Sequence, residues 1–203
     1  MLRPCVLILP LLLAIPQIRA ADHHHAAGDT DMAAHLSEDT GAGFDVHYLM
    51  MMVNHHKSGM DMAKAAQDKA ERQEVKTFAA KMIADQTRDI EQMTVLLTGM
   101  GTAAGEGHAS FRDQAQADLA DLRRHQGTEF DRAFLMHMAK HHQGAVAAAK
   151  LADRQAAAQS VKDLAKMQAE MQMKEVEQLQ SWHKEWFGSD LPAAAGAGAA
   201  HQH

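Results

Sequence analysis

Apolar residues recur every three or four positions along four long stretches of this chain, which places them on one face of an α-helix. No proline interrupts these stretches, so each can form a continuous helix. We therefore expect four long helices that bury their apolar faces against one another. The four predicted stripes are Tyr48, Met52, His56, Gly59, Ala63, Ala66 and Ala70; Val75, Phe78, Met82, Gln86, Asp89, Met93 and Leu96; Phe134, Met138, His142, Ala145, Ala149, Ala152 and Ala156; and Val161, Leu164, Gln168, Gln172, Glu175, Leu179 and Trp182.

The second half of the chain repeats the first. Phe-Asp, Leu-Met, Met and His-His occur in the same order and spacing in residues 44–97 and 130–183, with a constant offset of 86 residues. Each unit predicts a hairpin of two helices, and one amphipathic hairpin cannot bury its own apolar face. The sequence therefore predicts an all-α fold, a four-helix bundle made of two repeated helical hairpins. A shorter helix is expected between them, from Phe111 to about His125.

The two ends of the chain differ from this middle. Arg3, an apolar run and Ala20 predict a signal peptide over residues 1–20, in a run too short and too rich in proline to span a bilayer. We expect export to the periplasm, no transmembrane span after cleavage and, because the one cysteine is Cys5, no thiol in the mature chain. The predicted segments are a signal peptide (1–20), a His-containing flexible tail (21–43), the bundle (44–187) and a flexible Ala/Gly/His tail (188–203).

Composition and charge narrow the range of partners. Only 4% of the residues are aromatic, which favours helix over sheet. The chain has 26 Asp and Glu against 20 Lys and Arg, a net charge of −6. Such an acidic balance argues against nucleic acid as a partner.

Polar residues lie on the predicted stripes where apolar ones are expected. His56 and His142 follow Met52 and Met138 by one turn, and the stripes of the second helices carry Asp89 and Glu175. Leaving such groups buried without a partner costs several kcal/mol each, on the order of the transfer penalty of a polar group. Two interpretations stay open: the four groups satisfy one another in a structural layer, or they surround a metal ion.

Further histidines and methionines extend this pattern. The chain has 15 Met and 15 His, and His55 and His141 lie on the flank of each stripe. Thioether and imidazole without thiolate suit Cu(I), while imidazole also suits Cu(II), Zn and Ni. Met82, Met93 and Met167 are instead expected to be core residues. The candidate metal ligands of the bundle are His55, His56, His141, His142, Met51, Met52, Met138, His137, Asp89 and Glu175.

The N-terminal tail supplies a separate candidate. Cleavage after Ala20 would leave Ala21-Asp22-His23 at the N-terminus. A free amine, two backbone amides and the imidazole of His23 form a square-planar set for Cu(II) or Ni(II).

With these residues the chain resembles the DUF305 family, exported bacterial proteins with a ferritin-like helical bundle. The resemblance rests on Phe-Asp, Met and paired His at residues 44–56 and again at 130–142, and on Gln86 with Asp89 and Gln172 with Glu175. Some members are periplasmic copper-binding proteins linked to copper resistance. The resemblance therefore implies copper binding by the paired histidines and adjacent methionines; Asp89 departs from the more usual Glu.

Our leading hypothesis from the sequence is a periplasmic protein that binds copper for sequestration, transfer or resistance without catalysing a reaction. Its partners would be the metal ion and other periplasmic copper-handling proteins. One alternative is a metal-free structural or interaction bundle. The other is a carboxylate-bridged metalloenzyme built on His56, His142, Asp89 and Glu175, against which the absence of any Glu-x-x-His pair argues.

Overall fold

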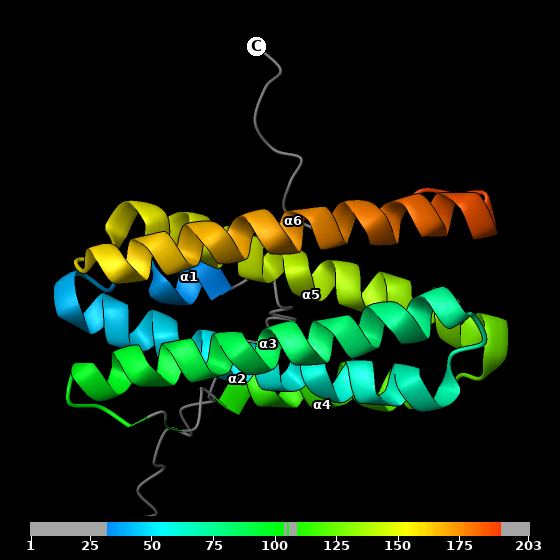
Figure 1. The fold of residues 1–203 in the computed structure, drawn as a ribbon, viewed down its shortest axis with the longest axis horizontal. Helices are drawn as coiled ribbons and strands as arrows, with labels where there is room; N and C mark the ends of the chain where they lie inside the picture. The colour runs from blue at the N-terminus through cyan, green and yellow to red at the C-terminus, as the bar shows by residue number, and fades with distance from the viewer. Residues whose placement is uncertain (1–31, 104, 106–108, 192–203) are drawn as a thin grey trace, which may run out of the picture.

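Six helices make up the described part of the chain, which in this computed structural model comprises residues 32–103, 105 and 109–191. The helices are α1 (Met32–Leu36), α2 (Gly41–Lys69), α3 (Gln73–Gly99), α4 (Ala109–Arg123), α5 (Gly127–Gln155) and α6 (Gln159–Phe187). The predicted all-α class and the four long helices are confirmed. The α2–α3 hairpin and the α5–α6 hairpin lie along each other, with α2 in contact with α5 (Figure 1).

Two buried aspartates join the hairpins at their turns. Both carboxylate oxygens of Asp45, on α2, accept hydrogen bonds from the backbone N–H groups of Ala157 and Ala158 at the start of α6, at 2.8 Å. Asp131, on α5, accepts in the same way from Glu71 and Arg72 at the start of α3, at 3.0 Å. We call these contacts the crossed caps. They satisfy N–H groups that lack an intrahelical partner and place a negative charge at each helix N-terminus.

The core is divided into two apolar clusters. One contains Phe44, Tyr48 and Met93, and the other contains Phe130, Phe134 and Met82. Between them, half-way along the long helices, lies a set of buried polar side chains, which we call the histidine layer. The layer consists of His55, His56, Gln86, Asp89, His141, His142, Gln172 and Glu175. The predicted stripes supply both clusters and most of this layer, so their predicted burial is confirmed, with Phe78, Leu96 and Trp182 only partly buried.

The segments outside the repeats depart from the predicted organisation in one respect. The sequence predicts a flexible tail over residues 21–43, but residues 32–36 form α1, with Met32 and Leu36 fully buried, and α2 begins at Gly41. The short helix expected from Phe111 is present as α4. Met82 and Met93 are core residues as predicted, whereas Met167 is 45% exposed, so that prediction is wrong. The predicted signal peptide and residues 192–203 lie outside the described residues.

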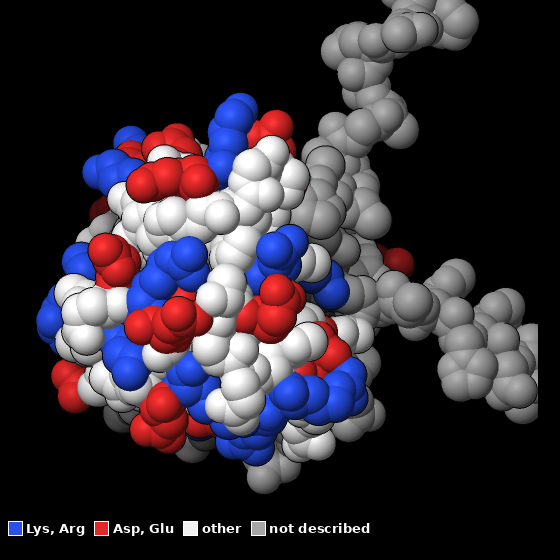
Figure 2. Space-filling view, turned by 90° about the vertical axis from the view of Figure 1, so that its right-hand side faces the viewer, with Lys and Arg blue, Asp and Glu red and all other residues white. Residues whose placement is uncertain are grey.

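The surface carries charges of both signs. Figure 2 shows one end of the molecule, where Lys and Arg alternate with Asp and Glu around uncharged residues. Within the described residues, no helix has the length and apolar character required to cross a membrane.

Candidate metal centre

His55 on α2 and His141 on α5 meet at the middle of the bundle. Their imidazole rings stack with centroids 3.5 Å apart and planes 28° apart. The two residues occupy the same position in the two repeats, so the meeting of α2 and α5 brings equivalent side chains face to face. Both histidines are buried. The sequence placed them on the flank of each stripe, and that flank is the contact between the two hairpins.

The hydrogen-bond partners of these rings assign their tautomers. His55 Nε2 lies 3.0 Å from the carbonyl oxygen of His141, which can only accept, so Nε2 of His55 carries the proton. The Ser58 hydroxyl donates to the carbonyl oxygen of His55 at 2.7 Å, and its oxygen lies 2.9 Å from His141 Nε2. Because that hydroxyl has one proton and has donated it, His141 must also donate from Nε2. Both rings therefore leave the Nδ1 lone pair free.

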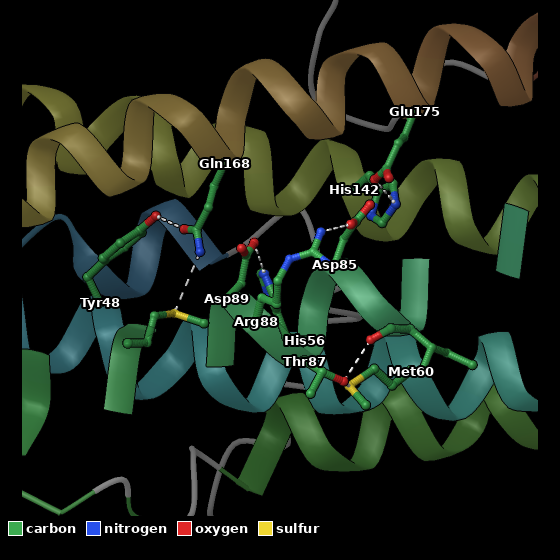
Figure 3. Close-up of polar contacts among 12 residues, drawn as sticks. Tyr48, His56, Met60, Asp85, Thr87, Arg88, Asp89, His142, Gln168 and Glu175 are labelled. Carbon is green, nitrogen blue, oxygen red and sulfur yellow. Dashed lines mark hydrogen bonds and ion pairs between the residues drawn. The ribbon is translucent and has the colours of Figure 1, made fainter. Parts of the chain in front are cut away.

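The second histidine of each pair faces a carboxylate. His56 Nε2 donates to Asp89 Oδ2 at 3.2 Å, between α2 and α3. Glu175 Oε2 lies 3.0 Å from His142 Nε2, between α5 and α6, although the two groups are not aligned as a hydrogen bond. Figure 3 shows the two histidine–carboxylate pairs on separate helix pairs. The twofold arrangement expected from the repeat thus holds each histidine against the carboxylate of its own hairpin.

The same ring nitrogen, Nδ1, lacks a partner in each of the four histidines. Among the described residues, Nδ1 of His55, His56, His141 and His142 is buried and has no hydrogen-bond partner. Burial, followed by the neighbouring histidines, lowers the pKa of His55 and of His141 well below the usual range. These two imidazoles are therefore neutral near pH 7, and neutral imidazole is the form that binds metal ions. A ligating histidine usually donates its other ring N–H to a carbonyl, hydroxyl or carboxylate, as happens here.

Amide side chains and a glycine complete the layer. A Cβ atom on Gly59 would lie 2.9 Å from Gln86 Oε1 and 3.0 Å from His141 Cε1, so a glycine allows α2 this close approach. Gln86 Oε1 and both amide atoms of Gln172 are buried without a partner. Next to the layer, the Tyr48 hydroxyl donates to Gln168, whose amide contacts Met93 Sδ at 3.7 Å (Figure 3). The layer is therefore only partly satisfied by its own members.

Imidazoles and carboxylates alone do not converge on one point. Within the part of the chain that the structure describes, no group of three or more His, Cys, Asp or Glu side chains is arranged to hold a metal ion. His56 with Asp89 and His142 with Glu175 remain two separate pairs. A complete ligand set in this region therefore requires other donors, of which the thioether of methionine is the candidate present in the bundle.

The remaining predicted ligands lie in different surroundings. His137 contacts two carboxylates of α4: its Nε2 is 2.9 Å from Asp121 Oδ2 and its Nδ1 is 3.5 Å from Asp118 Oδ1. The bond to Asp118, opposed by burial and reinforced by Asp121, raises the pKa of His137. Met52 and Met138 are fully buried in the two apolar clusters, one in each. His23 lies outside the described residues.

Some contributors were not singled out from the sequence. Ser58 was assigned no role from the sequence, yet it fixes the tautomer of His141. Met32 was assigned to a tail, yet it lines the same cleft as Met51 and His55. A signal for Ser58 was available, because it lies one turn from His55 on the same helix. Met32 was missed because the repeat was followed only over residues 44–97, although the same offset pairs α1 with residues 118–122 of α4.

Comparison with known proteins bears on this arrangement. The profile of a family described as a domain of unknown function, DUF305, matches residues 16–97. A structure of CopM in the Cu(I)-bound form is 30% identical, with a TM-score of 0.63, over 71% of this chain and 98% of that chain. The chain belongs to the DUF305 family. A second profile, also described as a domain of unknown function, DUF4142, matches residues 58–182.

Two structures of DUF305 proteins share the fold. A DUF305 fragment from Deinococcus radiodurans is 25% identical, with a TM-score of 0.62, over 70% of this chain and 95% of that chain. A DUF305 protein from Streptomyces coelicolor is 20% identical, with a TM-score of 0.65, over 73% of this chain and 96% of that chain. At that identity the second likeness concerns the fold alone. No curated protein sequence matches the chain significantly.

Proposed function

We propose that this protein binds copper outside the cytoplasm and holds or passes on the ion, without catalysing a reaction. The observation that carries the proposal is the set of four buried Nδ1 atoms without a partner, in rings of which three, those of His55, His56 and His141, have a hydrogen-bond partner at Nε2. Of these rings, His55 and His141 have a lowered pKa, and a neutral imidazole whose other nitrogen is held in this way fits a metal ion. His55 and His141 would supply nitrogen ligands, and neighbouring methionines would supply sulfur.

The choice of copper rests on donor chemistry and on relatives. Imidazole and thioether donors without thiolate suit Cu(I), and imidazole also suits Cu(II). CopM has been solved in Cu(I)-bound, Cu(II)-bound and Ag-bound forms. Zn and Ni fit imidazole but gain little from thioether sulfur. We infer that the predicted tail site at His23 would act on Cu(II), separately from the bundle.

A competition titration with Cu(I) and with Cu(II) tests this function. Three proteins are compared, all without residues 1–20. The first has no other change, the second carries His55→Gln and His141→Gln, and the third has both histidines but also lacks residues 21–31. This deletion keeps α1, which packs against the bundle. We expect the deletion to leave Cu(I) affinity unchanged and the double substitution to reduce it by roughly a hundredfold, as the loss of two ligands implies.

His183→Gln is the matched control. His183 is buried at the far end of α6, where its Nδ1 donates to the carbonyl oxygen of Ser189 at 2.7 Å, outside the histidine layer. This variant should bind copper as the wild type does. Equal affinity of the double variant and the wild type would contradict the proposal and favour a metal-free bundle, in which the layer only fixes the helix register.

A further inference from the structure

A cleft opens beside the histidine layer, between α2 and α4, with α1 at one side. It has a volume of about 200 Å³. Its lining includes Met32 from α1, Met51 and His55 from α2, and Ala115 and Leu119 from α4. His55 thus belongs both to the stacked pair in the bundle and to the wall of this cleft.

Three side chains of this lining are soft, uncharged donors, and they stand beside harder groups from Asn54, Lys57, Ser58, Asp61 and Gln116. Met51 lies one turn before His55 on the same face of α2, so its thioether and the imidazole are neighbours. Met32 is 0% exposed, Met51 3% and His55 6%, so each is largely withdrawn from water. Two thioethers and an imidazole whose Nδ1 has no partner are soft, uncharged donors. A soft monovalent cation is the ion that such a set prefers.

Within the helices described above, the combination of thioethers and an imidazole occurs next to the histidine pair of the first repeat and not next to that of the second. The position equivalent to Met51 in the second repeat is His137, which faces Asp118 and Asp121. The second repeat therefore has no thioether at the place that would match Met51. The counterpart of α1, 86 residues further along, is the end of α4, where the fully buried Leu122 matches Leu36 and Asp118 replaces Met32. The two histidine pairs are consequently inequivalent for a soft ion.

We propose that Met32, Met51 and His55 form one Cu(I) site in this cleft, and that α1 is therefore part of the binding site. The proposal rests on the copper-binding function and adds a ligand that precedes residues 44–97. Leu36 anchors the other end of α1 in the core, so the helix could remain docked with a different apolar residue at position 32. A leucine at position 32 would pack in the core as methionine does, but it has no thioether sulfur to bind the ion.

Methyl-¹³C methionine spectra of the full chain, titrated with Ag(I) as a diamagnetic soft cation, test the site directly. We expect the methyl signals of Met32 and Met51 to shift together and saturate at one equivalent. The signal of Met82, a core residue in the other apolar cluster, should not move. This measurement needs no substitution of the residues in the cleft, so it does not depend on how a variant folds.

A competition titration with Cu(I) measures the contribution of the sulfur. Met32→Leu retains the apolar volume and should lower Cu(I) affinity by roughly tenfold or more, since loss of an outer-shell partner alone costs about tenfold. Met82→Leu is the matched control and should bind as the wild type does. If Met32→Leu binds Cu(I) unchanged, or the Met32 methyl signal stays still while others shift, α1 is only a packing element and this inference is overturned. A wild-type protein that binds neither ion would instead overturn the copper function itself.

Discussion

At the scale of single residues, Ser58 makes the two halves of the histidine layer different. The equivalent position in the second repeat is Gly144. The Ser58 hydroxyl connects His141 Nε2 to the carbonyl oxygen of His55, whereas His55 Nε2 reaches the carbonyl oxygen of His141 directly. The orientation of one histidine thus depends on a side chain and that of the other on the backbone.

We expect Ser58→Ala to release the tautomer of His141. Its Nε2–H would lose an acceptor, so the proton would exchange between the two ring nitrogens and Nδ1 would no longer always be free. Copper affinity should fall by roughly tenfold, as for other outer-shell partners. Long-range ¹H–¹⁵N spectra of the histidine rings in the metal-free protein measure the tautomer.

Ser58→Thr should restore both the tautomer and the affinity, because it returns the hydroxyl. Ser181→Ala, at an exposed position of α6, is the control and should change neither. An unchanged Nε2–H tautomer of His141 in Ser58→Ala would show that the serine does not position this ring.

At the scale of helices, the crossed caps explain how two hairpins of limited packing area stay in register. Asp131 is fully buried, accepts two backbone N–H bonds and receives a third bond from Arg72 Nη1 at 3.2 Å. No side chain of the α3 N-cap residue itself caps that helix. The N-terminus of each second helix is therefore satisfied by the opposite hairpin, which fixes the position of one hairpin along the other.

Asp131→Asn should lower the free energy of unfolding by about 2–3 kcal/mol, the range for a buried hydrogen-bonded charge. An amide would direct N–H donors toward backbone N–H donors, and the charge at the α3 N-terminus would be lost. Urea denaturation measures the change. Glu129→Gln, in the first turn of α5, is the control, because that carboxylate is exposed and its ion pair with Arg132 is worth less than about 1 kcal/mol. Equal effects of the two substitutions would mean that the cap contributes no more than a surface charge.

Much of the fold could be predicted from periodicity, because each long helix repeats its apolar positions over many turns. The stripes of α2 and α5 are buried in full. α1 escaped prediction because five residues are too few to show a period, and its burial depends on contacts with α5 and α2. The exposure of Met167 shows the limit for a flexible apolar residue, which fits a core or a surface equally well.

The candidate site could be predicted only in its residue types. The sequence indicated that His55, His56, His141 and His142 form a set, because they recur at the same place in both repeats. It could not indicate that His55 and His141 stack, because that depends on where α2 meets α5 in space. The pairing of each second histidine with the carboxylate of its own hairpin likewise depends on helix packing.

At the scale of the whole molecule, the histidine layer separates two apolar clusters that would otherwise form one core. Its unpartnered Nδ1 and amide atoms oppose folding, because water would satisfy them in the unfolded chain. An ion bound by the folded bundle alone should therefore stabilise it by linkage. A free concentration of 100 times Kd contributes about 2.7 kcal/mol and raises Tm by roughly 5–10 °C in a protein of this size.

Thermal unfolding with and without Ag(I), followed by circular dichroism, measures this shift. The variant with His55→Gln and His141→Gln should show little of it, while removal of residues 21–31 should preserve it. A shift that disappears with residues 21–31 would place the ion on the N-terminal segment, and the layer would then be structural.

The crossed caps also have a consequence for the origin of the chain. Asp45 reaches residues 157–158 and Asp131 reaches residues 71–72, so each contact becomes the other when 86 residues are added to one partner and subtracted from the other. Such reciprocity is the signature of an isologous interface between two identical subunits. A lone hairpin would leave its aspartate and its helix N-terminus unmatched, and a second copy would satisfy both. Because both halves lie in one chain, this contact forms at any protein concentration, and the two halves can carry different residues at equivalent positions, as Met51 and His137 or Ser58 and Gly144 do.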